Sequence, residues 1–156
     1  MKVVQSFSVP LAQATLWAFI QDFERVARCL PGVEQVAITG VDDLELVVTQ
    51  RLGPFSVTFD TKMHIDSRDE GRSVTFTAVG QSIRGAAGNV RATNIVSLAA
   101  GADGSTLVTI DADVALGGML GAVGQKVVAK QATKVTQQFA ANLAQGLAGA
   151  TEGGGG

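Results

Sequence analysis

Few side chains in this sequence could carry out nucleophilic or acid–base chemistry. The single histidine, His64, lies in PFSVTFDTKMHID (54–66), where strict alternation puts it on the polar side of a strand. The single cysteine, Cys29, has no histidine near it in sequence. A nucleophile needs a base within reach, and one cysteine with one histidine cannot form a zinc site unaided. We therefore interpret His64 as a solvated surface residue and Cys29 as a small core residue.

The paired carboxylates do not indicate an active site either. They fall in expected turns or on the solvent side of a strand: Asp42 with Asp43, Asp69 with Glu70, and Asp111 with Asp113. The stretch GAAGNVRA (85–92) lacks the Lys-Ser/Thr pair and the following helix of a phosphate-binding loop. The sequence therefore predicts a protein that is not an enzyme, with no catalytic residue and no metal site.

Composition narrows the class of protein further. Hydrophobic residues make up 46% of the 156 residues and charged residues 17%, against about 25% charged residues in a usual soluble chain. The net charge of −2 gives no signature of nucleic-acid binding. The opening MKVVQSFSVP has no long apolar run, and the lone cysteine suits a reducing compartment, so we expect a cytoplasmic protein.

The elements around these residues follow from their periodicity. Residues 2–9 predict a strand, and 10–30 predict two short helices, with Asp22 capping the second. From 33 to 116, six alternating segments are separated by turn signals, which indicates antiparallel strands. Apolar residues at helical spacing over 119–149 predict a long helix that covers one face of the sheet.

Alternation directs one apolar side of each strand toward this helix. The residues we expect to face an enclosed ligand are aromatic, aliphatic or methionine: Phe55, Phe59, Met63, Phe76, Val90, Leu120, Val128, Val135 and Phe139. Such a lining suits an oily ligand. The alternative is a core that its own side chains fill, because any half-buried sheet shows the same alternation.

Several segments resemble the CoxG family of carbon monoxide dehydrogenase subunits. They are FSVPLAQATLWAFIQDFERVARCLPGVEQV (7–36), GPFSVTFDTKM (53–63), GAAGNVRATN (85–94) and LGGMLGAVGQKVVAKQATKVTQQFAANL (116–143). The resemblance covers the chain to about residue 148, and the block from Trp17 to Gly32 is its most specific part. It implies an α+β helix-grip fold of the START-like (SRPBCC) superfamily. In that fold a curved seven-stranded antiparallel sheet surrounds a long C-terminal helix, two short helices follow strand 1, and an apolar cavity is enclosed.

The resemblance also implies partners. Family members accompany molybdenum CO dehydrogenase, help attach it to the cytoplasmic membrane and are linked to passing its electrons to a membrane quinone. It therefore implies a non-catalytic binding protein with no covalent cofactor, a bound menaquinone-type isoprenoid lipid and a peripheral location at the inner face of the membrane. The alternatives are a START-like cyclase or hydratase, for which Asn94, Gln131 and Asn142 are the inward polar candidates, and a purely structural membrane recruiter.

Two features remain at the C-terminal side. Glycines weaken the expected helix start in LGGMLGAVGQKVVAK (116–130), either for close approach to the sheet or as a gate for an isoprenoid chain. The candidate gate residues are Gly85, Gly88, Gly117, Gly118, Gly121 and Gly124. We expect a ligand-binding domain over 1–149 and a flexible linker over 150–156, truncated before a membrane-binding tail.

Overall fold

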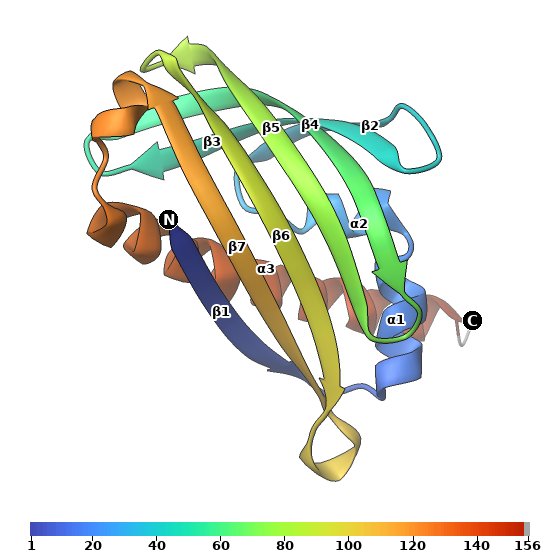
Figure 1. Cartoon of the computed structure of the whole chain (residues 1–156). Helices are drawn as coiled ribbons and strands as arrows, with labels where there is room; N and C mark the ends of the chain where they lie inside the picture. Colours follow the sequence, from blue (N-terminus) through green and yellow to red (C-terminus); the bar gives the residue numbers. More distant parts are fainter. Residues whose placement is uncertain (155–156) are drawn as a thin grey trace.

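The computed structural model describes the backbone of residues 1–154 and the side chains of residues 1–147. Seven strands and three α-helices follow the expected order (Figure 1). The strands are β1 (Lys2–Val9), β2 (Val33–Ile38), β3 (Asp43–Leu52), β4 (Phe55–Asp69), β5 (Ser73–Gly85), β6 (Gly88–Ala100) and β7 (Thr106–Gly118). The helices are α1 (Gln13–Ile20), α2 (Phe23–Arg28) and α3 (Gln125–Gly154), with 3-10 turns η1 (Ala102–Gly104) and η2 (Met119–Ala122).

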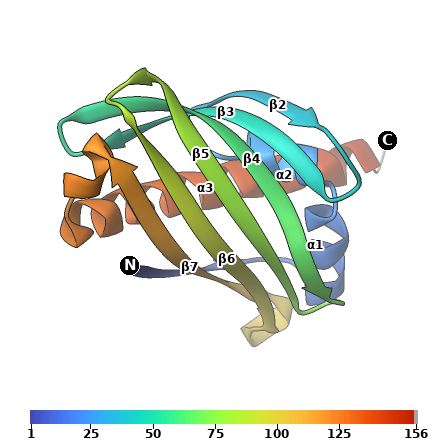
Figure 2. The same cartoon turned by 45° about the horizontal axis from the view of Figure 1, so that its top comes forward.

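All seven strands form one antiparallel sheet in the order β1-β7-β6-β5-β4-β3-β2. Figures 1 and 2 show the sheet curving around α3, with α1 and α2 at one end and η2 at the other. This confirms the expected α+β helix-grip architecture. The helix lies in the concavity because its apolar face and that of the sheet exclude water together.

The pairing register brings inward residues of successive strands into line. Leu44 lies opposite Met63, Met63 opposite Ala78, Ala78 opposite Ala92, and Ala92 opposite Val114. Because side chains alternate between the two faces of a strand, such a row lies on the concave side. The alternation read from the sequence is therefore confirmed across five strands.

The two short helices close one end of the sheet. Asp22 caps α2 by accepting a hydrogen bond from the Arg25 backbone N–H at 3.3 Å, as expected. Two hydrogen bonds join α1 to the β4–β5 turn. The Trp17 indole N–H donates to Glu70 Oε1 at 3.1 Å. Gln13 Nε2 donates to the Gly71 carbonyl at 2.8 Å. Leu16 and Trp17 are buried in a core cluster that also contains Leu143 and Leu147 of α3.

The start of α3 differs from the expectation. Residues 116–118 finish β7, residues 119–122 form η2, and the helix begins at Gln125. The reason is a contact with β6: Gly118 pairs with Gly88, and Gly118 has φ +65°. At its other end the helix continues to Gly154, into the segment expected to be a linker, and residues 155–156 lie outside the described part.

The glycines around η2 have different surroundings, which predicts opposite effects of alanine. A Cβ on Gly118 would lie 2.9 Å from the Gly88 Cα in a left-handed backbone conformation, whereas a Cβ on Gly124 meets nothing within 4 Å. We expect Gly118→Ala to lower the free energy of unfolding by about 1–3 kcal/mol. We expect Gly124→Ala to raise it by up to about 1 kcal/mol, because alanine restricts the unfolded chain.

Denaturant unfolding of the two single variants measures both effects. Equal changes in the two variants would contradict the assignment of close approach to Gly118. The distance between Gly118 and Gly88 supports close approach of the two backbones at these glycines. The role of the six glycines as a gate stays a prediction.

Candidate functional site

The space between the sheet and α3 contains a cavity of about 460 Å³. It is lined from the inner face of the sheet, from α1 and α2, and from one face of α3. The face of α3 that lines it carries Val128, Ala132, Val135, Phe139 and Leu143. Side chains of the protein therefore do not fill this space completely. Its volume lies in the range of ordinary small-molecule pockets, roughly 300–1,000 Å³.

Most of the expected ligand-facing residues line this cavity. They are Phe59, Met63, Phe76, Val90, Val128, Val135 and Phe139. Phe55 and Leu120 are not among the lining residues, and their contact with a ligand stays a prediction. Both belong to a core cluster with Leu52, Val57 and Phe59, of which Leu52 and Phe59 also line the cavity, and Leu120 is completely buried.

The polar groups on the cavity wall are amides and hydroxyls, and no side chain among the lining residues is ionisable. They belong to Gln5, Gln50, Thr61, Asn94, Gln131 and Thr136. Asn94 and Gln131 are two of the three inward polar residues expected from the sequence. The third, Asn142, instead donates from Nδ2 to the Cys29 carbonyl at 2.9 Å. Amides are poor proton donors and acceptors, so this wall offers no acid–base pair.

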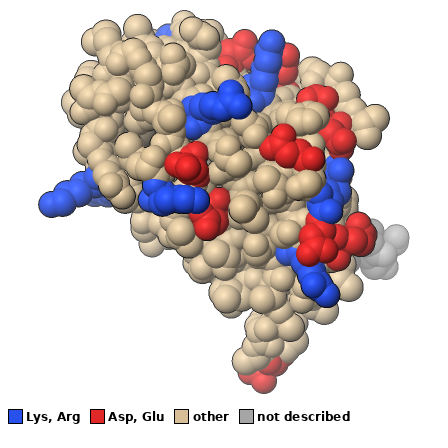
Figure 3. All heavy atoms as spheres, viewed as in Figure 1, with Lys and Arg blue, Asp and Glu red and all other residues tan. Residues whose placement is uncertain are grey.

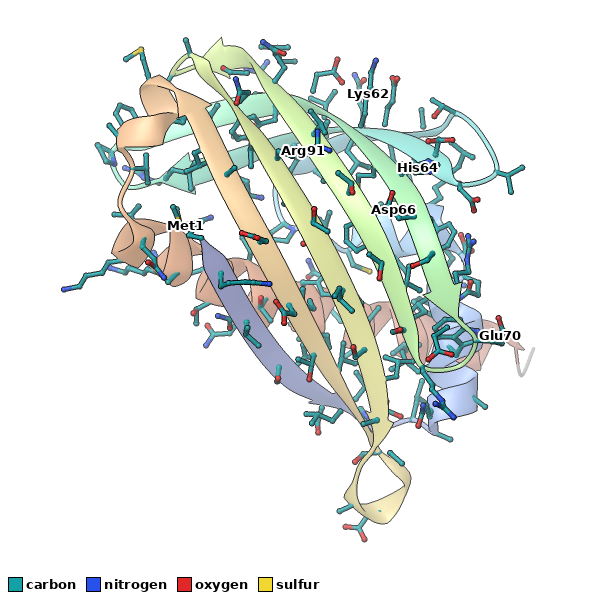
Figure 4. The ribbon with its side chains drawn as sticks, in the orientation of Figure 1. Met1, Lys62, His64, Asp66, Glu70 and Arg91 are labelled. Atoms are coloured by element: carbon teal, nitrogen blue, oxygen red, sulfur yellow. The ribbon has the colours of Figure 1, made fainter. Side chains whose placement is uncertain are left out.

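His64 lies on the outer face of β4, as expected. Figure 4 shows it projecting from the outer side of the sheet together with Lys62 and Asp66. Its partner is Asp43, the first residue of β3, with Nδ1 and Oδ1 2.7 Å apart. The hydrogen bond to Asp43, with the nearby acidic charges, raises the pKa of His64 above its ordinary value.

This raised pKa predicts a small pH dependence of stability. The folded protein holds the His64 proton more tightly than the unfolded chain does, so the pair stabilises the fold below about pH 6.5. The contribution is lost as the pH rises through the raised pKa of the folded state. We expect His64→Ala to destabilise more at about pH 5 than at about pH 9, measured by urea unfolding, with ligand binding unchanged. An equal effect at both pH values would contradict the assignment of the shift to this pair.

The other side chains that could react, Cys29 and Asp42, have partners that belong to the fold itself. Cys29 is buried, and its Sγ–H donates to the Arg25 carbonyl at 3.4 Å. Burial raises the pKa of this thiol, with Arg25 opposing, so the thiol form persists at neutral pH. Asp42, in the β2–β3 turn, forms an ion pair with Arg68 of β4 at 2.7 Å. Within residues 1–147, no group of three or more His, Cys, Asp or Glu side chains is arranged to hold a metal ion.

A second, smaller cleft was missed by the sequence reasoning. It has a volume of about 310 Å³ and lies between the turn at Pro31–Gly32, β3 and α3. Its lining includes Gln50 and Gln131, which also line the cavity. No sequence signal could have found it, because it depends on the packing of β3 against a helix that is far away in the chain.

Charges are distributed unevenly over the surface. Figure 3 shows a broad area without Lys, Arg, Asp or Glu at the end of the molecule where η2 and the β5–β6 turn lie. Met119 and Ile83 are each 59% exposed at this end. Within residues 1–154, no helix is both long enough and apolar enough to cross a membrane.

Comparison with known proteins decides the family. The model of the CoxG family of carbon monoxide dehydrogenase subunits matches residues 6–148. The chain belongs to the CoxG family. Among curated proteins, none matches this CoxG-family sequence.

Solved structures similar to this CoxG-family chain show the fold. A conserved protein from Geobacillus kaustophilus is 16% identical, with a TM-score of 0.83 and 95% of each chain covered. A START superfamily protein from Mycobacterium smegmatis is 18% identical, with a TM-score of 0.65, and covers 92% of this chain and 94% of its own. The ZhuI aromatase/cyclase from Streptomyces sp. R1128 is 14% identical, with a TM-score of 0.55, and covers 97% of this chain and 93% of its own. The fold is therefore START-like.

Proposed function

We propose that this protein is a non-catalytic carrier of an isoprenoid quinone of the menaquinone type. The observation that carries the proposal is the cavity of about 460 Å³, whose lining is apolar apart from amides and hydroxyls. An isoprenoid chain buried there removes hundreds of Å² of apolar surface from water. At roughly 25 cal/mol per Å² this favours binding by several kcal/mol before the loss of freedom on binding is subtracted.

The family gives the proposed partner. A CoxG protein is expected to serve carbon monoxide dehydrogenase, and we place its function between that enzyme and the cytoplasmic membrane. Oxidation of CO by water yields CO2, two protons and two electrons, and reduction of a quinone to its quinol consumes two protons and two electrons. The carrier would bring the quinone to the enzyme and return the quinol to the membrane, and its six glycines near η2 would form the gate.

A cyclase or hydratase is not our proposal. The likeness to an aromatase/cyclase is one of fold, at 14% identity. The wall presents Asn94 and Gln131 where such chemistry needs a group that exchanges a proton near neutral pH.

The proposal is tested by extraction of the purified protein with organic solvent, followed by mass spectrometry of the extract. We expect an isoprenoid quinone in near-equal amount to the protein. After delipidation, the protein should take up added menaquinone-4 and speed quinol formation by CO dehydrogenase from quinone-loaded vesicles. A delipidated protein that takes up no menaquinone-4 would overturn the proposal.

A further inference from the structure

The cavity and the outer cleft share a partition made of three side chains. Gln50 of β3, together with Gln131 and Val135 of α3, lines both spaces. On one side lies the apolar volume of about 460 Å³, and on the other lies the cleft of about 310 Å³. A ligand that reaches across this partition would have its apolar body inside and one end at the two glutamines.

The two glutamines are held in place by hydrogen bonds. Gln131 Nε2 donates to Gln50 Oε1 at 2.9 Å, and Gln50 Nε2 donates to the Pro31 carbonyl at 2.8 Å. Each amide nitrogen has two hydrogens, and each of these contacts uses one of them. The partition therefore retains N–H donors for an acceptor on a ligand. Gln50 also interrupts an inward row of β3 that is otherwise aliphatic: Leu44, Leu46, Val48 and Leu52.

The Pro-Gly turn positions this pair. Gly32 has φ +81°, and its carbonyl accepts a hydrogen bond from the Thr49 N–H at 2.9 Å. A Cβ on Gly32 would lie 2.1 Å from the Thr49 carbonyl oxygen, so only glycine lets the turn approach β3 this closely. This approach brings the Pro31 carbonyl within reach of Gln50. The Pro-Gly pair thus has a local role in fixing the partition.

The charges around the cleft also favour a ligand group that accepts hydrogen bonds. Arg51 and Lys134 line it, and neither has an ion-pair partner in the part of the chain whose side chains are described. Glu34 approaches this region through the cleft residue Thr49, whose hydroxyl donates to Glu34 Oε2 at 3.1 Å. Its carboxylate is already bound by Arg84 at 2.9 and 3.1 Å. The cleft therefore presents more donors than free acceptors.

We infer that the Gln50–Gln131 pair and the cleft beside it form a subsite for an oxygen-bearing head group. The head accepts hydrogen bonds from the two amides, and the apolar chain of the same molecule fills the cavity. This inference rests on the proposed function and adds the orientation of the ligand. It selects amphiphiles with a carbonyl-type head over hydrocarbons of the same shape.

The test compares two ligands that differ only in the head oxygens. Menaquinone-2 and 2-methyl-3-geranylnaphthalene are each partitioned between delipidated protein and cyclodextrin. We expect the wild-type protein to prefer the quinone by about fivefold or more, since a hydrogen bond of this kind changes an equilibrium by about two- to tenfold. In Q50L/Q131L the preference should fall to about onefold while the hydrocarbon binds as before. Replacing both partners of the pair by apolar groups of similar shape leaves no unpaired amide.

The control is Q35L/Q137L, which makes the same chemical change at two exposed glutamines outside both spaces. It should keep the wild-type preference. If Q50L/Q131L does not fold, Q131L alone decides by the same comparison, because Gln50 stays bonded to Pro31. A preference that persists without the pair, a wild type without preference, or an equal loss in the control would overturn the subsite. A wild type that binds neither ligand would instead overturn the proposed function.

Discussion

Phenylalanine at both Ala78 and Ala92 is expected to lower the affinity for menaquinone-4 at least about tenfold. These alanines lie opposite each other on β5 and β6, and both line the cavity. Two rings placed there occupy the space that the ligand would take, and a tenfold loss corresponds to only about 1.4 kcal/mol. The free energy of unfolding should stay unchanged or rise, because filling a cavity adds contacts to the core.

The matched control is T77F/T93F. Thr77 and Thr93 also pair across β5 and β6, one residue away in register and on the opposite face of the sheet. This variant should bind menaquinone-4 like the wild type, measured by fluorescence or by partition from cyclodextrin. Wild-type affinity in A78F/A92F would show that the ligand binds elsewhere.

Leu16→Ala is expected to cost about 2–5 kcal/mol of stability. Leu16 has no exposed surface and belongs to the core cluster that also contains Trp17, Leu143 and Leu147. Its removal takes apolar surface out of the core and leaves a void that the helices cannot fully close. A whole domain is stable by only about 5–15 kcal/mol, so the variant should unfold at clearly lower urea concentration.

Thr15→Ala on the same helix provides the comparison. Thr15 is exposed beside Leu16, so its truncation should change the free energy of unfolding by less than about 0.5 kcal/mol. Similar losses in the two variants would mean that α1 is destabilised as a helix, and that the contact with α3 carries no special weight.

Periodicity predicted most of the fold because each strand repeats one rule locally. Alternation alone predicted that Met63 and His64 lie on opposite faces of a strand. The capping side chain of Asp22 indicated the start of the second helix. The start of α3 could not be read this way. Gly117 and Gly118 belong to β7 because they pair with Asn89 and Gly88, a contact that no local pattern contains.

The same limit applies to the site. Phe59 and Phe76 were found because inward alternation is enough to place a residue on the cavity wall. Phe55 has the same alternation, yet it is the first residue of β4 and packs in the cluster that contains the buried Leu120. The pairing of Gln50 with Gln131 depends on how α3 packs against β3, which sequence spacing does not encode.

The position of β1 in the sheet determines the order in which the protein can fold. From β2 to β7, each strand pairs with the next one in the chain through a short connection. β1 instead pairs with β7, so that Lys2 lies opposite Asp113. Pairings between residues distant in sequence form slowly, because closing the intervening chain costs entropy before any contact forms. On the ribosome, β1 therefore remains without its neighbour until β7 has been synthesised. The apolar inner face of the sheet stays open to water until α3 has been made and covers it.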